Sequence, residues 1–305
     1  MCLRTGRSQT ALLKVPWIED PETFSKRPLW VEFPKYQDAF GVDKQYMLGN
    51  ALLVAPVLDP GVISTDVIFP GNEEFYFGFI TPYDILPILF WIIQMLSRKL
   101  QTDPDMDWLK QGDTSALQDL SPWQCWYDFR NFSCVGSSHK QTVNVTLEED
   151  TAGPINDVLI PVYQRGGSII PLQTTIGKSS GWMENSPYEL RVALNRKGTA
   201  VGEIYIDDGH SFQYLHENMF TYRKFTFKKN VLYSRSADKL GCFPVKSTLE
   251  NVHVMGFKKS PSEVIVHQAG REKRKLSYTY HKKLCVLSLE NVSIRVSEDW
   301  EIHIK

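Results

Sequence analysis

The sequence predicts a mainly β protein, and two observations carry this prediction. From about residue 186 onward, apolar residues recur at every second position, which places them on one face of half-buried antiparallel strands. Upstream, short apolar runs lie between Pro and Gly residues, and long amphipathic helices are nearly absent. The C-terminal half is therefore expected to form a β-sandwich or barrel.

The upstream strands are predicted from two kinds of pattern. The runs PLWVEF (28–33) and ALLVAPV (51–57) are typical of fully buried strands. The segments VISTDVIFP (62–70) and TVNVTLE (142–148) alternate between apolar and polar residues, as half-buried strands do.

The C-terminal half contains alternating strands separated by turn sequences. The alternation includes Leu190, Val192 and Leu194, then Ile204 and Ile206, then Cys285, Leu287 and Leu289, then Val292, Ile294 and Val296. Turns are expected at DDG (207–209), KKN (228–230), ADKLG (237–241) and KKSPS (258–262), because Gly, Asn, Asp and Pro favour turn conformations.

The composition is that of a soluble globular protein. The chain has 305 residues, 42% hydrophobic and 23% charged, with a net charge of -1, which gives no electrostatic footprint for nucleic acid or anionic lipid. The five cysteines form no Cys-x-x-Cys pair, so no zinc or redox site is predicted. The apolar run near the N-terminus is too short for a secretory signal, and the compartment is not predicted.

The run FYFGFITPYDILPILFWIIQML (75–96) has the length of a membrane span, roughly 20 residues, and contains no Lys or Arg. Pro82, Asp84 and Pro87 interrupt it, and a charged residue inside a bilayer is costly. These residues argue against a membrane span, and membrane association through 75–96 stays an alternative.

A search for catalytic chemistry finds no site. Glu73/Glu74, Glu148/Glu149 and Asp207/Asp208 are adjacent pairs, and adjacent side chains on a strand point to opposite faces. Asp207 and Asp208 with Gly209 are interpreted instead as a hairpin turn. His210 and His216 lack a metal-ligand spacing, and GKSS (177–180) lacks the leading Gly of a phosphate loop. The prediction is no catalytic, cofactor-binding or metal-binding residue, and no cofactor.

Five segments, taken in order, resemble the C-terminal region of family 31 glycoside hydrolases. They are RPLWVEFP (27–34), QYMLGNALLVAPVLDPG (45–61), WYDF (126–129), IPVYQRGGSIIPLQ (160–173) and GEIYIDDGHSFQYLHENMFTYRKFTF (202–227). The resemblance implies two C-terminal β-sandwich domains after a remnant of a (β/α)₈ barrel. The implied units are a barrel remnant at 1–57, a proximal sandwich at 58–175 with an atypical insertion at 75–125, and a distal sandwich at 176–305.

The resemblance also implies the function of a retaining α-glucosidase, which releases terminal α-linked glucose from oligosaccharides. The catalytic aspartates of that family lie upstream in motifs of the types Trp-Asn-Asp-Met-Asn-Glu and Gly-Ala-Asp, and this sequence contains neither motif. The chain is therefore expected to be inactive alone. The alternative is a β-sandwich module that binds carbohydrate, through Trp182, Tyr205 or Tyr214, or an unidentified partner.

Overall fold

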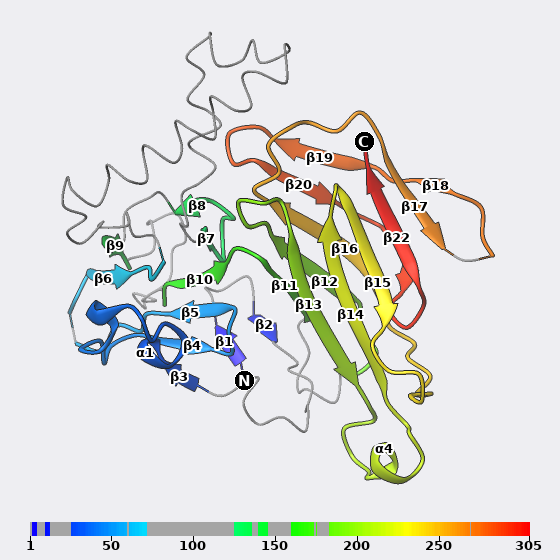
Figure 1. Ribbon diagram of the computed structural model, residues 1–305, viewed down its shortest axis with the longest axis horizontal. Helices are drawn as coiled ribbons and strands as arrows, with labels where there is room; N and C mark the ends of the chain where they lie inside the picture. The colour runs from blue at the N-terminus through cyan, green and yellow to red at the C-terminus, as the bar shows by residue number, and fades with distance from the viewer. Residues whose placement is uncertain are drawn as a thin grey trace, which may run out of the picture.

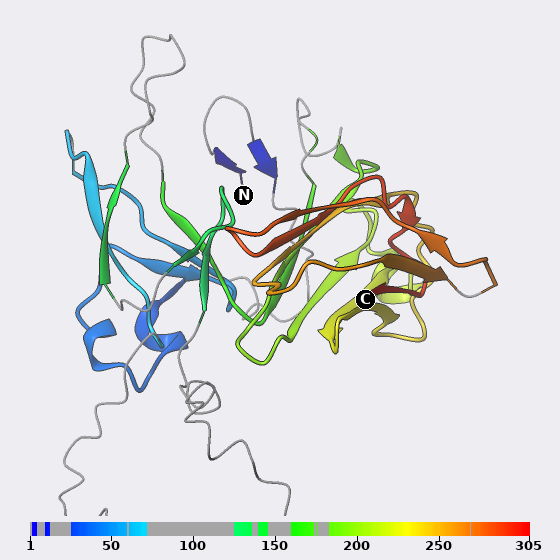
Figure 2. The ribbon, with the colours of Figure 1, turned by 90° about the horizontal axis from the view of Figure 1, so that it is seen from above.

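The computed structural model describes residues 2–4, 10–12, 26–59, 61–71, 125–135, 140–145, 160–173, 175, 183–268 and 270–305. It confirms a mainly β fold, with two groups of strands side by side (Figures 1 and 2). The run at 75–96 and nearly all of the predicted insertion lie outside the described residues. Among the helices within the described ranges, none is long and apolar enough to cross a membrane.

The smaller group is a sandwich of a six-stranded sheet and a two-stranded sheet. The larger sheet has the order β3 (Lys26–Pro28), β4 (Tyr46–Leu48), β5 (Leu52–Val54), β10 (Val162–Arg165), β7 (Trp126–Asp128) and β8 (Cys134–Val135). The second sheet pairs β6 (Ser64–Ile68) with β9 (Lys140–Asn144). Buried residues from both sheets, including Met47, Leu53, Val67, Phe69, Trp126 and Tyr163, form one apolar cluster.

The predicted buried strand at 28–33 is wrong. Leu29–Glu32 form a one-turn helix, α1, and a short 3₁₀ helix, η1 (Gln37–Ala39), follows it. Pro34 explains where α1 ends, because the residue before a proline is disfavoured in the helical region. Leu29 is buried, but Trp30 and Val31 are each 44% exposed, so this apolar run does not lie wholly in a core.

The larger group is one curled sheet of 14 strands. Its main path runs through β18 (Arg274–Lys275), β17 (Val264–Gln268), β22 (Trp300–Ile304), β15 (Val231–Ser236), β14 (Thr221–Lys228), β13 (Ala200–Ile206), β11 (Ser168–Gln173), β12 (Tyr188–Ala193), β16 (Thr248–Met255), β20 (Val286–Leu289) and β19 (Tyr278–His281). Off this path, β1 (Cys2–Arg4) pairs with β2 (Thr10–Leu12), which touches β11, and β21 (Ile294–Arg295) pairs with β16.

The curled sheet folds over a single apolar core. Side chains on β13, β14, β15, β17 and β22 share one cluster with side chains on β12, β16 and β20. The predicted alternation is confirmed on β14, where buried and non-buried residues alternate along the whole strand. By contrast, all six residues of β12 are buried, so both faces of this strand are covered.

The two groups are joined through a tight turn between β10 and β11. Gly167 has a φ of 96°, which favours glycine. A Cβ on Gly166 would lie 2.9 Å from the Cβ of Cys125, so a larger residue would collide there. The two glycines thus allow the tight turn, and Tyr127 adds a hydrogen bond from its hydroxyl to the Leu194 carbonyl at 2.8 Å.

Two of the predicted turns show how local chemistry sets the connections. Lys229 and Asn230 both have positive φ and link β14 to β15, which is the two-residue hairpin turn expected at KKN. At DDG, β13 and β14 do pair as a hairpin, but the connection extends over 207–220 and contains a one-turn helix, α4 (Gln213–His216).

Candidate functional site

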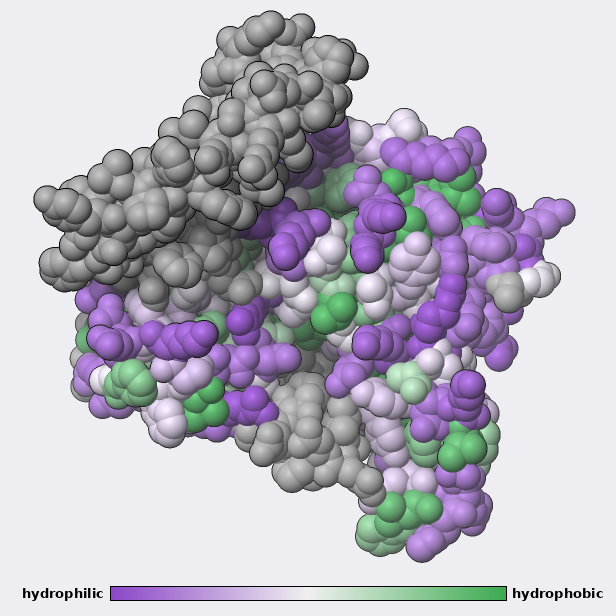
Figure 3. Space-filling model, in the orientation of Figure 1, coloured by the Kyte–Doolittle hydropathy of each residue, from purple (hydrophilic) through white to green (hydrophobic). Residues whose placement is uncertain are grey.

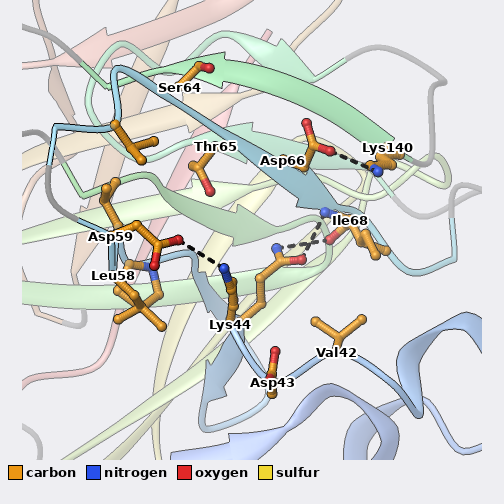
Figure 4. A pocket seen from close by; sticks show the side chains of 14 residues that line it. Val42, Asp43, Lys44, Leu58, Asp59, Ser64, Thr65, Asp66, Ile68 and Lys140 are labelled. Carbon is orange, nitrogen blue, oxygen red and sulfur yellow. Dashed lines mark hydrogen bonds and ion pairs between the residues drawn. The ribbon is translucent and has the colours of Figure 1, made fainter.

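The smaller group contains an open cavity of ≈ 380 Å³ between the chain at 42–45 and the β6–β9 pair (Figure 4). Two ion pairs lie on its wall: Lys44 Nζ is 3.0 Å from Asp59 Oδ2, and Lys140 Nζ is 2.8 Å from Asp66 Oδ2. Gln45 lines the wall between them and accepts a hydrogen bond from the Ile68 amide at 3.0 Å. Lys44, Lys140 and Gln45 are therefore already engaged in contacts within the chain.

A second cavity of ≈ 500 Å³ adjoins the first, because the two share Val42, Asp43, Gln45, Pro56 and Leu58. Its lining is more apolar and includes Trp30, Phe40 and Leu58, which are 44%, 58% and 60% exposed. Lys26 lies over the Tyr46 ring in the same wall, 4.3 Å from its centroid. Exposed large apolar side chains around one hollow are typical of a surface that another polypeptide covers.

Asp59 and Asp66 line one cavity, but they do not form a glycosidase pair. Such an enzyme needs one carboxyl group whose raised pKa keeps it protonated as the acid. The hydrogen bond from Lys140, together with one from Thr142 at 2.7 Å, lowers the pKa of Asp66 instead. Both carboxylates are therefore suited to structural ion pairs.

A buried polar cluster lies where the two groups meet. Arg191 on β12 places its Nε 2.9 Å from Glu189 Oε1, and both side chains are only 9% exposed. Arg191 also donates to the Phe129 carbonyl and lies over the Phe129 ring, 4.2 Å from its centroid. His253 on β16 completes the cluster, with Nε2 3.7 Å from Glu189 Oε2.

The turn after β7 covers this cluster and explains why both faces of β12 are buried. Phe132 stacks on His253 with ring centroids 5.0 Å apart and adopts a positive φ of 64°, which is rare for a bulky residue. Burial penalises the Glu189 carboxylate, but the neighbouring His253 and Arg191 side chains favour its charged form more strongly, and its pKa is lowered. Glu189 is thus an ionised partner of Arg191, and the arrangement is an interlock between the two groups.

The aromatic residues named for sugar contact are not brought together in one site. Trp182 lies outside the described residues. Tyr205 is half-buried and stacks on Phe220 with centroids 5.3 Å apart, whereas Tyr214 in α4 contacts Phe212. Phe212 is 70% exposed, and Figure 3 shows hydrophobic residues at the lower tip, where Figure 1 places α4. No shared platform of Tyr205 and Tyr214 supports a sugar site.

Asp207 and Asp208 organise their own loop. Asp207 Oδ1 accepts a hydrogen bond from the Gly209 amide at 2.8 Å, and Asp208 accepts from the hydroxyl of Ser211 at 2.6 Å and from the amides of His210 and Ser211. His210 and His216 lie in this loop, and no cluster of three or more possible metal ligands occurs among the residues with described positions.

We expect Asp208 to make stability depend on pH in the acid range. The Ser211 hydroxyl, followed by the two amides, lowers the pKa of Asp208 to about 2. A carboxyl whose folded pKa is depressed stabilises the fold above its unfolded value, about 3.9, and loses that effect as pH falls through 2. The urea midpoint of Asp208→Asn should lie below that of the wild-type chain at pH 6, and the gap should narrow towards pH 2. A gap that is constant with pH would contradict this assignment.

Comparisons with known proteins identify relatives over nearly the whole chain. Residues 23–86 match the model described as the glycosyl hydrolase family 31 C-terminal domain. Neutral alpha-glucosidase C of Mus musculus is 39% identical over 278 residues, which are 91% of this chain and 24% of the relative. Neutral alpha-glucosidase AB of Homo sapiens is 32% identical over 92% of this chain and 23% of the relative.

A solved glucosidase II alpha subunit, in its alpha3-Glc2-bound form, shares the fold with a TM-score of 0.63. The two chains are 21% identical, and the match covers 92% of this chain and 25% of that structure. This chain therefore spans about a quarter of the length of the curated relatives it matches. The matched segment 23–86 contains the whole lining of the second cavity and all of the first except Lys140.

Proposed function

Because this chain carries the C-terminal region of a family 31 glycoside hydrolase, we propose that it serves as the non-catalytic C-terminal part of an α-glucosidase. In this role it would pack against an upstream catalytic domain and would not hydrolyse sugars alone. The α-linked oligosaccharide substrate would be held by that upstream domain.

The observation that carries the proposal is the exposed apolar hollow lined by Trp30, Phe40 and Leu58. It lies in the segment that matches the family model. Burying such side chains gains roughly 25 cal/mol for each Å² of apolar surface removed from water. A neighbouring domain seated on this hollow would therefore stabilise both partners.

Five carboxyl groups of the described residues are held in their charged form. Asp66, Glu189, Asp208, Glu263 and Glu301 have lowered pKa values, and hydrogen bonds or cations favour the charged form of each. A retaining glycosidase needs a protonated acid as well as a nucleophile. The sequence also lacks both aspartate motifs of the family.

We expect the purified chain to release no glucose from maltose or 4-nitrophenyl α-glucoside above the buffer blank. Loss of the nucleophile, the acid and the domain that positions them removes many powers of ten in rate. The measurement is a coupled glucose assay, and measurable release by this chain alone would refute inactivity.

A chimera tests the docking role separately. This chain replaces the corresponding C-terminal quarter of mouse neutral alpha-glucosidase C, and the chimera is expected to retain α-glucosidase activity. The double substitution Trp30→Asp and Phe40→Asp should lower activity on the order of tenfold or more, because it places unpaired carboxylates in the contact. Leu240→Asp, at a residue 67% exposed in the larger group, is the matched control and should have no effect.

A further inference from the structure

Four turns at one end of the larger group each carry two adjacent cationic residues. Strands β12 and β16 are parallel, so the turns that follow them, 194–199 and 256–261, lie at the same end of the sheet. The turn 282–285 precedes β20, which is antiparallel to β16, and so lies at this end too. The turn 229–230 lies at this end as well. It follows β14, whose last residues pair with the start of β13, directly after the turn 194–199.

Hydrogen bonds hold three of these turns against one another. The Leu194 amide donates to the Met255 carbonyl at 3.0 Å, and the Phe257 amide donates to the Cys285 carbonyl at 2.9 Å. The Tyr280 hydroxyl donates to the Phe257 carbonyl at 2.9 Å. The charges on these turns are therefore presented from a fixed framework.

The turn 194–199 carries Arg196 with Lys197, and the turn 229–230 carries Lys229 directly after Lys228 at the end of β14, and all four are exposed. The other two carry Lys258 with Lys259, and Lys282 with Lys283, also exposed. We call these eight residues the basic end. The segments that bear them, 190–202, 224–237, 254–262 and 276–289, contain no Asp or Glu.

The seven lysines of the basic end differ from other cations in the described part of the chain. Lys44, Lys140 and Arg223, for example, each lie within 3.0 Å of a carboxylate oxygen. Glu263 lies near the basic end at the start of β17, but it is already paired with Lys275 and Lys305. The positive charge of these seven lysines is therefore not neutralised by a carboxylate within the four turns.

At the opposite end of the larger group, one connection is acidic. The connection 207–220 carries Asp207, Asp208 and Glu217 and no Lys or Arg. Glu298 and Asp299, just before β22 begins, lie at this end as well, but they are paired with Arg271 and Arg223.

We propose that the basic end docks peripherally on an anionic membrane surface. Seven of its eight cations are Lys, whose flexible point charge suits diffuse attraction better than the bidentate recognition typical of Arg. Protein hot spots instead centre on aromatic or Arg anchors, and on these turns the exposed large apolar side chain is Leu284, at 39%. Clusters of four to eight basic residues are the usual signature of binding to anionic lipid headgroups.

The test is sedimentation of the full chain with vesicles of phosphatidylcholine alone or with about 30% phosphatidylserine. The wild-type chain should bind the anionic vesicles, dissociate from them as the NaCl concentration is raised, and not bind the neutral vesicles. The variant Lys258→Gln, Lys259→Gln, Lys282→Gln, Lys283→Gln should bind at least about thirtyfold more weakly, since each Lys near an anionic bilayer is worth roughly fivefold.

The matched control removes four exposed lysines elsewhere: Lys35→Gln, Lys239→Gln, Lys246→Gln, Lys273→Gln. It should keep wild-type binding, and unchanged circular dichroism should verify that both variants fold. Equal binding to neutral vesicles, equal loss in the control, no binding by the wild-type chain, or preferential binding of soluble polyglutamate would overturn the proposal. Because none of these readouts measures hydrolysis, they are independent of the glucosidase assignment.

Discussion

Replacing Arg191 by Met should lower the free energy of unfolding by about 3 to 5 kcal/mol, because it leaves the Glu189 carboxylate buried without its cation. Arg191 and Glu189 are both 9% exposed at the side chain, so water cannot compensate for the lost contact. The same change also removes the hydrogen bond to the Phe129 carbonyl and the packing over its ring. Urea unfolding followed by tryptophan fluorescence measures this loss.

The double variant Arg191→Met, Glu189→Leu is the control for this experiment. Proteins in which apolar residues of similar volume replace a buried ion pair are often no less stable than the original protein. The double variant should therefore recover most of the loss seen in Arg191→Met. A loss below about 1 kcal/mol in the single variant would show that water reaches Glu189 and that the interlock is not as closed as described.

Trp126→Ala should lower the free energy of unfolding by about 3 to 5 kcal/mol, as truncation of a large aromatic side chain in a core does. Trp126 is fully buried, its Nε1 donates to the Pro70 carbonyl at 3.1 Å, and the rings of Phe33 and Phe69 lie 6.2 Å from it. Trp126 on β7 thus packs against residues that directly follow α1 and β6. Differential scanning calorimetry or urea unfolding provides the measurement.

Two substitutions separate the causes of that effect. Trp126→Phe keeps most of the aromatic packing and loses the hydrogen bond, so its cost should be smaller, about 1 to 3 kcal/mol. Trp30→Ala removes the same side chain from a position that is 44% exposed, and its cost should stay below about 1 kcal/mol. Equal effects at Trp30 and Trp126 would contradict the burial assigned to each.

Much of the fold could be predicted because alternation and turn chemistry are local signals. The KKN turn and the alternation of β14 follow from residues within a few positions of one another. The run PLWVEF was predicted as a strand because apolar residues alone do not distinguish a buried strand from a short helix with exposed faces. The unit boundaries at 57 and 175, and the insertion at 75–125, remain predictions.

The sequence could not reveal features that depend on distant segments. Glu189 and Arg191 occupy the polar positions of an alternating strand, and only the contact with Phe129 and Phe132 shows that this face is covered. The net charge of -1 likewise includes both the basic end and the acidic connection 207–220, so it does not show that these charges lie at separate ends. The exposed hollow at Trp30 and Phe40 also arises from packing, since nothing in the local pattern shows which apolar residues are left outside.

The position of β22 in the sheet has a consequence for synthesis on the ribosome. This strand is late in the sequence, yet it lies between β15 and β17 and pairs with both. When β17 leaves the exit tunnel, its long neighbour has not yet been made, and it can pair only with the two residues of β18. One layer of the larger group must therefore wait for Trp300–Ile304, and the edge of β15 stays open to other strands until then.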